Sequence, residues 1–292
     1  MVSLSSNKMT DTLYIIGNGF DLHHGLRTSY ANFRDDYAHK KCKLWNSLTT
    51  IFGDKLNDNM WWSDFENQLG QIDYSYGMDS HRGIVPWILE IENLLKNEIP
   101  PLFGYWLKDI NVRVAVDEEL GINPSADFFT FNYTMLLEKA YLVDNNNVWH
   151  IHRSIDDYIK KGENPIVGHD STLAEQASRF NEFRKTHPDF RPDIGDMINH
   201  NIVKGAKMVK DKIYVHDLNN RFNQYSDIKH FIAMGFSFND IDLPYIEKII
   251  NVNRNIVDAD WTLYIHSPKD YDAINKLLSL GINKSKITTK NW

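Results

Sequence analysis

The sequence has little cysteine, no basic excess and no long apolar run, and each absence excludes a class of protein. Its only cysteine, Cys42, rules out an internal disulfide framework and a cysteine-based zinc module. Acidic residues outnumber basic ones by 39 to 32, so the net charge of -7 gives no strong nucleic-acid signal. No segment approaches the roughly 18 apolar residues of a membrane helix. The opening segment MVSLSSNKMT also lacks the apolar core of a signal peptide, so we expect a cytoplasmic protein without a membrane partner.

The stretch LYIIGNGFDLHHG, residues 13–25, is the one around which the chain is organised. Its apolar start is typical of a buried parallel strand, and Gly17 and Gly19 then predict a turn that opens a helix. Glycines in such a turn let the backbone approach a ligand closely, and the amides that follow would face a phosphate. The stretch lacks the third glycine of the GxGxxG spacing. The alternative that this turn is purely structural therefore stays open.

Further apolar runs predict strands, and helices separate most of them. We expect strands at 13–16, 127–133, 148–151, 165–168, 230–236 and 261–266. We expect helices over 28–45, 88–99, 173–185, 243–254 and 270–280, with Pro100 and Pro101 ending the second of them. This alternation is typical of an α/β protein with a Rossmann-like parallel sheet covered on both faces. The 292 residues then form a single domain with helical insertions at about 40–122 and 171–228.

Small and polar side chains follow five of the predicted strands. They are Gly17, Asn18, Gly19 and Asp21 after the first strand, Asn132, Tyr133 and Thr134 after the second, His150 and His152, then Gly235, Ser237 and Asp240, and finally His266 and Ser267. Ligands of parallel sheets gather at the carboxyl ends of the strands. Asn, His, Ser and Asp side chains can hold ribose hydroxyls or relay protons there, which favours a nucleotide site.

Several of these residues also have a structural interpretation. Asn132 could cap a strand end, and Asp21 could cap a helix instead of contacting a ribose or an adenine amine. His24 could touch a ligand or only pack the start of the helix. His150 and His152 alternate, so in a strand they would share one face.

The tryptophan-rich segment that follows is expected to be structural. Trp61, Trp62 and Phe65 are expected in a core. Asp64 and Glu66 stand two residues apart on a helix, so they would diverge and not act as a carboxylate pair.

Five blocks in this order resemble the bacterial abortive-infection AbiH family. They are GNGFDLHHGL, WSDFE at 62–66, FNYTMLLEKAY, HIHRS and GFSFNDIDLPY, and the resemblance runs from about residue 12 to 267. The same layout is more distantly similar to sirtuin-like (DHS-like) NAD-binding domains. Their glycine loop would correspond to 17–21, their GIP segment to 25–27, their asparagine block to 131–133, their histidine to His152 and their GTS segment to 235–237. Asp21 stands where that loop has serine, and Arg153 where glycine follows the histidine.

The resemblance implies an enzyme that hydrolyses NAD to ADP-ribose and nicotinamide, with NAD depletion halting an infected cell. It implies Asn132 and His152 as catalytic residues, with water as the nucleophile, since Cys42 alone cannot build the zinc module of deacetylating sirtuins. The expected NAD-binding residues are Gly17, Asn18, Gly19, Phe20, Asp21, His24, Gly25, Thr134, Gly235, Ser237, Asp240 and Ser267. No metal is expected.

Two other functions stay open. One is a nucleotide-binding sensor or interaction module without turnover, which Asp21 and Arg153 favour. The other is a metal-dependent nucleotide hydrolase or nuclease that would use Asp240, Asp242 and the histidines. The sequence identifies neither a phage-derived trigger nor an oligomeric state.

Overall fold

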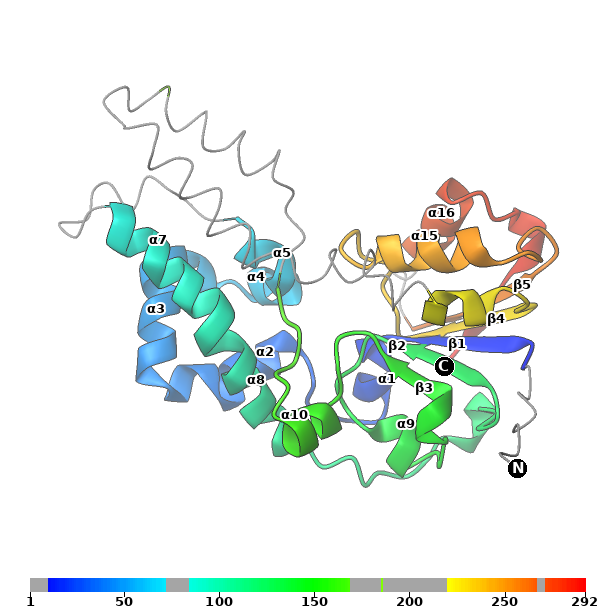
Figure 1. Cartoon of the computed structure of the whole chain (residues 1–292), viewed down its shortest axis with the longest axis horizontal. Coiled ribbons are helices and arrows are strands. Elements are labelled where there is room, and N and C mark those ends of the chain that lie inside the picture. Colours follow the sequence, from blue (N-terminus) through cyan, green and yellow to red (C-terminus); the bar gives the residue numbers. More distant parts are fainter. Residues whose placement is uncertain (1–9, 72–83, 169–184, 186–219, 267–270) are drawn as a thin grey trace, which may run out of the picture. The chain divides into compact units, whose positions relative to one another are not determined.

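The computed structural model describes residues 10–71, 84–168, 185, 220–266 and 271–292 (Figure 1). The chain divides into two compact units. The first comprises Met1–Leu26, Asn111–Ile151 and His216–Trp292, and the second comprises Arg27–Ile110 and His152–Val215. The expectation of a single domain with two helical insertions stays a prediction.

The first unit is built on a six-stranded sheet in which all pairs of neighbouring strands are parallel. Its strands are β1 (Thr12–Ile16), β2 (Asp127–Thr130), β3 (Val148–His150), β4 (His230–Met234), β5 (Asp260–Ile265) and β6 (Ile287–Asn291). The order across the sheet is β3-β2-β1-β4-β5-β6, which is the order of the doubly wound Rossmann fold. The expected fold class is therefore confirmed. The direction of winding reverses between β1 and β4, and a ligand of such a sheet binds outside the carboxyl ends of those strands.

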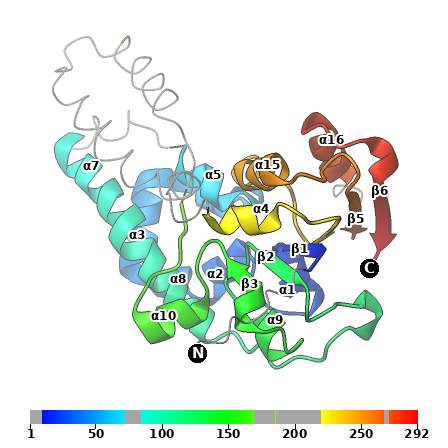
Figure 2. The same ribbon diagram turned by 45° about the vertical axis from the view of Figure 1, so that its right-hand side comes forward.

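The central strands are buried because helices cover both faces of the sheet. Leu13, Ile15 and Ile16 of β1 are 0% exposed, and the ring of Tyr14 stacks on Phe128 of β2. Figures 1 and 2 show α15 and α16 on one face of the sheet and α1 and α9 on the other. The bounds of the helices in this unit are α1 Asn18–His23, η4 Glu118–Leu120, α9 Leu136–Lys139, η5 Asn145–Asn147, η6 Asn223–Tyr225, α15 Leu243–Val252, α16 Asp272–Ser279 and η8 Lys284–Lys286.

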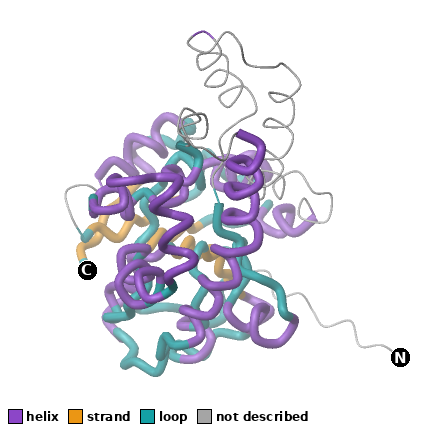
Figure 3. Tube along the Cα trace, turned by 90° about the vertical axis from the view of Figure 1, so that its left-hand side faces the viewer, coloured by secondary structure: helices purple, strands orange, loops and turns teal. Residues whose placement is uncertain are grey.

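The described part of the second unit contains helices and loops but no strand; the strands, orange in Figure 3, belong to the first unit. Its helices are α2 Tyr30–Asp36, η1 Ala38–Lys40, α3 Cys42–Phe52, η2 Gly53–Asn57, α4 Asn59–Ser63, α5 Phe65–Leu69, α7 Ile84–Asn93, η3 Leu94–Glu98, α8 Ile99–Lys108 and α10 Ile155–Lys161. Trp61, Trp62 and Phe65 lie in its core as expected, at 4%, 0% and 0% exposure. The Trp62 indole NH donates to the Leu56 carbonyl at 2.9 Å.

Pro100 and Pro101 do not end a helix, contrary to the prediction. The helix α7 passes through a π-helical segment, η3, into α8, and the two prolines occupy the first turn of α8. The first-turn amides of an α-helix need no intrahelical acceptor, so proline is tolerated there. The wider π turn ahead of them makes this junction compatible with a continuous helix.

Other boundaries also differ from the sequence prediction. Residues 165–168 form no strand; the Ile166 amide donates to the His152 carbonyl at 3.0 Å, and the Gly168 amide donates to the Glu66 side chain at 3.2 Å. The strand β3 ends at His150, and Ile151 and His152 lie in a turn, so the two histidines do not share a strand face. The helix expected over 28–45 is divided into α2, η1 and α3. The helix expected at 173–185 falls almost wholly outside the described residues.

Candidate functional site

Three glycines bring the loop after β1 onto the loop after β4, at the point where the sheet reverses its winding. A Cβ atom on Gly17 would lie 2.5 Å from the Gly235 carbonyl oxygen, and one on Gly19 would lie 2.6 Å from the Gly235 Cα. Gly235 itself has a φ of +61°, and its Cβ would lie 2.1 Å from the Phe20 nitrogen. The glycines are therefore required by contact between two backbones, whereas the sequence suggested the approach of a ligand.

Three amides of the first loop donate to backbone carbonyls. The Gly17 amide donates to Met234 at 3.0 Å, the Gly19 amide donates to Gly235 at 2.9 Å, and the Phe20 amide donates to Gly17 at 3.0 Å. The helix that begins here, α1, has only six residues. The contact of these amides with a phosphate stays a prediction, and the bonding of the loop gives it no support.

Asp21 is a buried carboxylate that joins α1 to the loop after β2. It lies in α1 at 1% exposure, and it accepts hydrogen bonds from the Asn132 amide nitrogen and the Thr134 hydroxyl, both at 2.8 Å. Burial raises the pKa of Asp21 to about 7, although the hydrogen bonds from Thr134 and Asn132 and the field of His150 oppose the rise. Asp21 is thus neither a surface helix cap nor an open ligand contact.

Asn132 follows β2, and both its backbone amide and its side-chain nitrogen donate hydrogen bonds. Its backbone amide donates to the Thr130 hydroxyl at 3.0 Å, and its side-chain nitrogen donates to Asp21. Because the side-chain nitrogen lies against Asp21 Oδ1, the Asn132 Oδ1 atom is turned away from Asp21. Asn132 is 6% exposed, and its Oδ1 meets no hydrogen-bond donor among the residues that the structure describes.

A second buried asparagine, Asn253, provides a comparison, because both ends of its side-chain amide are hydrogen-bonded. Asn253 is 5% exposed, and its side-chain nitrogen donates to the carbonyls of Tyr225 and Ile228 at 2.7 and 3.0 Å. Its Oδ1 accepts from the Asn255 amide at 2.8 Å. Buried polar atoms are normally satisfied in this way, so the lone Oδ1 of Asn132 requires an explanation.

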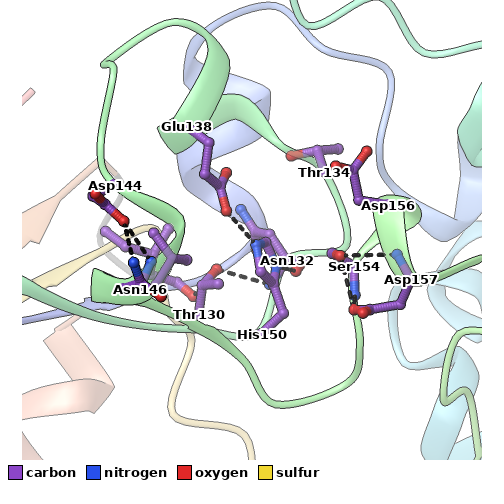
Figure 4. A network of polar contacts seen from close by, with 12 residues as sticks. Thr130, Asn132, Thr134, Glu138, Asp144, Asn146, His150, Ser154, Asp156 and Asp157 are labelled. Atoms are coloured by element: carbon purple, nitrogen blue, oxygen red, sulfur yellow. Dashed lines mark hydrogen bonds and ion pairs between the residues drawn. The ribbon is translucent and has the colours of Figure 1, made fainter. Parts of the chain in front are cut away.

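His150 and Glu138 form a buried pair beside Asn132, and Figure 4 shows their contacts. The Nδ1 atom of His150 lies 2.8 Å from the Asn132 carbonyl oxygen, and its Nε2 atom lies 2.8 Å from Glu138 Oε1. A carbonyl oxygen only accepts, so Nδ1 carries a proton and a second proton is shared between Nε2 and Glu138. The side chains of His150 and Glu138 are 9% and 7% exposed. The pair fixes the backbone of Asn132.

His24 is built into the framework of the first unit. Its Nδ1 lies 2.8 Å from the Phe20 carbonyl oxygen, and its Nε2 accepts from the Tyr141 hydroxyl at 2.6 Å. The Tyr141 oxygen in turn accepts the Asp117 amide at 3.1 Å. Burial lowers the pKa of His24, which favours the neutral ring that this pattern needs. Both ring nitrogens therefore have structural partners.

The remaining predicted ligand residues differ in their exposure. Phe20 is fully buried and packs against the His24 ring at 4.6 Å. Asn18, Gly25, Ser237 and Asp240 are exposed, and Asp240 is paired with Lys276. Ser267 lies outside the described residues.

His152 belongs to the second unit and is 4% exposed. The next residue, Arg153, has a φ of 67°, the left-handed conformation that glycine adopts most readily. Its guanidinium donates to the Asn164 carbonyl at 2.9 Å and lies 3.3 Å from Glu163. Arg153 thus adopts a backbone conformation that favours glycine.

Asp64 and Glu66 have separate partners, as expected of residues that diverge. Asp64 accepts from the side chains of Asn67 and Gln68, and Glu66 accepts from the Gly168 amide at 3.2 Å.

Sequence reasoning missed Glu138, Tyr141 and Asp117. One signal was present for Glu138, since it is an acidic residue directly after the apolar run Met135–Leu137. An acid in such a place is rarely buried unless it is paired. Among the described residues no three His, Cys, Asp or Glu side chains are arranged to hold a metal ion.

The first unit is therefore a Rossmann-like parallel sheet with a buried polar cluster at its carboxyl edge. The profile of the bacteriophage abortive infection AbiH family matches residues 13–93 and 84–265, so the chain belongs to this family. The resemblance read from the sequence blocks is thus confirmed, and the membership supports a role in antiphage abortive infection. A comparison with curated proteins finds no match. No helix in the described ranges is both long and apolar enough to cross a membrane.

Proposed function

We propose that this chain acts in abortive infection by binding NAD at the carboxyl edge of its sheet and hydrolysing it to ADP-ribose and nicotinamide. The observation that carries the proposal is the buried Oδ1 of Asn132, which has no donor among the described residues. A ribose hydroxyl or a water molecule is a donor that would satisfy it. The strand order supports the proposal, since doubly wound sheets bind dinucleotides at this edge.

The reaction breaks the bond between the ribose carbon C1′ and the nicotinamide nitrogen. The electron pair of that bond leaves with nicotinamide, and the oxygen of a water molecule bonds to C1′ as its proton passes to a base. Asn132 would orient the ribose hydroxyl or the water through Oδ1. The sirtuin resemblance assigns the base to His152, because a neutral imidazole accepts protons near neutral pH.

Nicotinamide release from NAD by the purified protein, with and without a chelator, tests the proposal. We expect release that persists in chelator and falls by at least about 10²-fold in Asn132→Ala and His152→Ala. Asn253→Ala is the matched control, since it removes an asparagine of equal burial whose bonds are all structural. It should lower the melting temperature and leave the rate per folded molecule unchanged.

A protein that binds NAD without releasing nicotinamide, even with infected-cell extract added as a source of trigger, would contradict hydrolysis. It would favour the second candidate, a nucleotide sensor. Two departures from the sirtuin pattern favour that candidate, Asp21 in the glycine loop and Arg153 after His152. Release that chelator abolishes would point instead to a metal-dependent hydrolase.

A further inference from the structure

The carboxylate of Asp21, in the polar cluster at the carboxyl edge, is not used by any step of the proposed reaction. It is 1% exposed, which excludes a direct contact with a diffusing ligand in this conformation. Its Oδ1 faces the Asn132 amide nitrogen and its Oδ2 faces the Thr134 hydroxyl, each at 2.8 Å. Burying a carboxylate without a cation at bonding distance costs free energy, so its retention requires a reason.

We propose that Asp21 is the positioning residue of this site: its carboxylate holds the Asn132 amide so that Oδ1 is the atom presented to substrate. This inference rests on the proposed function for the identity of the substrate. The hydrogen bond between Asn132 and Asp21 does not depend on the proposed function.

The geometry makes Asp21 the group that decides which end of the amide faces outward. An asparagine amide has two nearly isosteric ends, one that donates and one that accepts. No other hydrogen bond to the Asn132 side chain occurs among the described residues, so Asp21 alone distinguishes the two ends. Without an acceptor at that position, rotation by about 180° would present NH2 to a substrate hydroxyl in place of oxygen.

The surrounding bonds fix the backbone of Asn132 but not this rotation. Its amide is held by Thr130 and its carbonyl by His150, which is paired with Glu138. These backbone contacts remain when Asp21 is changed. His150 on β3 and Glu138 on α9 are also the charged groups whose fields act on Asp21.

Two substitutions distinguish the role of Asp21 as a hydrogen-bond acceptor from the space that its side chain fills. Asp21→Leu keeps the size of the side chain and removes the acceptor. Asp21→Asn keeps an oxygen for Asn132 and can donate its own NH2 to the Thr134 hydroxyl. We expect kcat for nicotinamide release to fall at least about 10²-fold in Asp21→Leu with KM changed less, and Asp21→Asn to restore most of the loss.

A readout that does not depend on turnover separates this inference from the proposed function. In protein labelled with 15N-asparagine, the side-chain NH2 signal of Asn132 is assigned by its disappearance in Asn132→Ala. We expect this signal to move in Asp21→Leu and to keep its position in Thr134→Val, where the bond to Asp21 remains. We also expect it to titrate with Asp21 in the wild type and to lose that titration in Asp21→Asn, which covers the case in which Asp21→Leu does not fold.

The two failures are distinguishable. A wild-type protein that neither binds nor cleaves NAD, with the Asn132 signal still coupled to Asp21, refutes the proposed function alone. An Asn132 signal that is indifferent to Asp21→Leu and to the titration refutes the positioning role, whatever the activity. Unchanged kcat in folded Asp21→Leu refutes it as well.

Discussion

Replacing Asp21 with asparagine is expected to change how the stability of the protein depends on pH. Burial raises the pKa of this carboxyl from 3.8 to about 7 in the folded state. Between these values the folded state holds a proton that the unfolded state has released. The contribution of Asp21 to stability is therefore present at low pH and lost as pH rises through the folded pKa.

The size of the effect follows from the two pKa values. Between pH 5 and pH 8, ionisation of Asp21 should lower the free energy of unfolding of the wild type by roughly 2–3 kcal/mol. Asp21→Asn cannot ionise, so it lacks this loss. The melting temperature of the variant relative to wild type should then rise by roughly 5–10 °C on going from pH 5 to pH 8.

Thermal unfolding of both proteins across this pH range is the measurement. Comparing the difference between the proteins at two pH values cancels the other titrating groups and any cost of the substitution that is independent of pH. Asp144→Asn serves as the matched control, because Asp144 belongs to the same unit, is exposed and caps η5, where asparagine caps equally well. If the melting temperatures of Asp21→Asn and wild type differ by the same amount at pH 5 and at pH 8, the raised pKa of Asp21 is refuted.

Two further outcomes are expected from the packing around the loops. Gly235→Ala should cost at least about 3 kcal/mol of stability by urea unfolding, since its Cβ would overlap the Phe20 nitrogen. Gly281→Ala, where φ is +88° but nothing lies within 4 Å, should cost only the backbone strain of roughly 1–2 kcal/mol; equal losses would contradict the contact argument. Tyr141→Phe should cost about 1–2 kcal/mol by the same assay, because His24 Nε2 and the Asp117 amide both lose their partner. No loss there would show that water replaces the hydroxyl.

The sequence predicted the central strands well because each is a short apolar run with a turn signal behind it. β6 was missed for the opposite reason: ITTKN is polar, and four of its five residues are exposed. It forms because the backbone of β5 pairs with it in a parallel ladder, which runs from Trp261 opposite Ile287 to Ile265 opposite Asn291. Backbone hydrogen bonds to a neighbouring strand do not require apolar side chains, so the hydrophobic pattern of such a strand does not reveal it.

The candidate site could be predicted only in part. Polar residues at strand exits were visible, and Asn132 was among them. The bond from Asn132 to Asp21 joins residues 111 positions apart, and it depends on which strands are neighbours in the sheet. Periodicity reports the face of a strand but not its neighbour, so the sequence did not predict that Asp21 accepts a hydrogen bond from Asn132.

The contact between Gly17, Gly19 and Gly235 has a mechanical consequence. Where two loops meet through side chains, rotamers can change and one loop can shift while the other stays. Here backbone meets backbone, and the Gly19 amide is also bonded to the Gly235 carbonyl. The exits of β1 and β4 consequently move as one body, and a ligand that displaced either loop would displace the other with it.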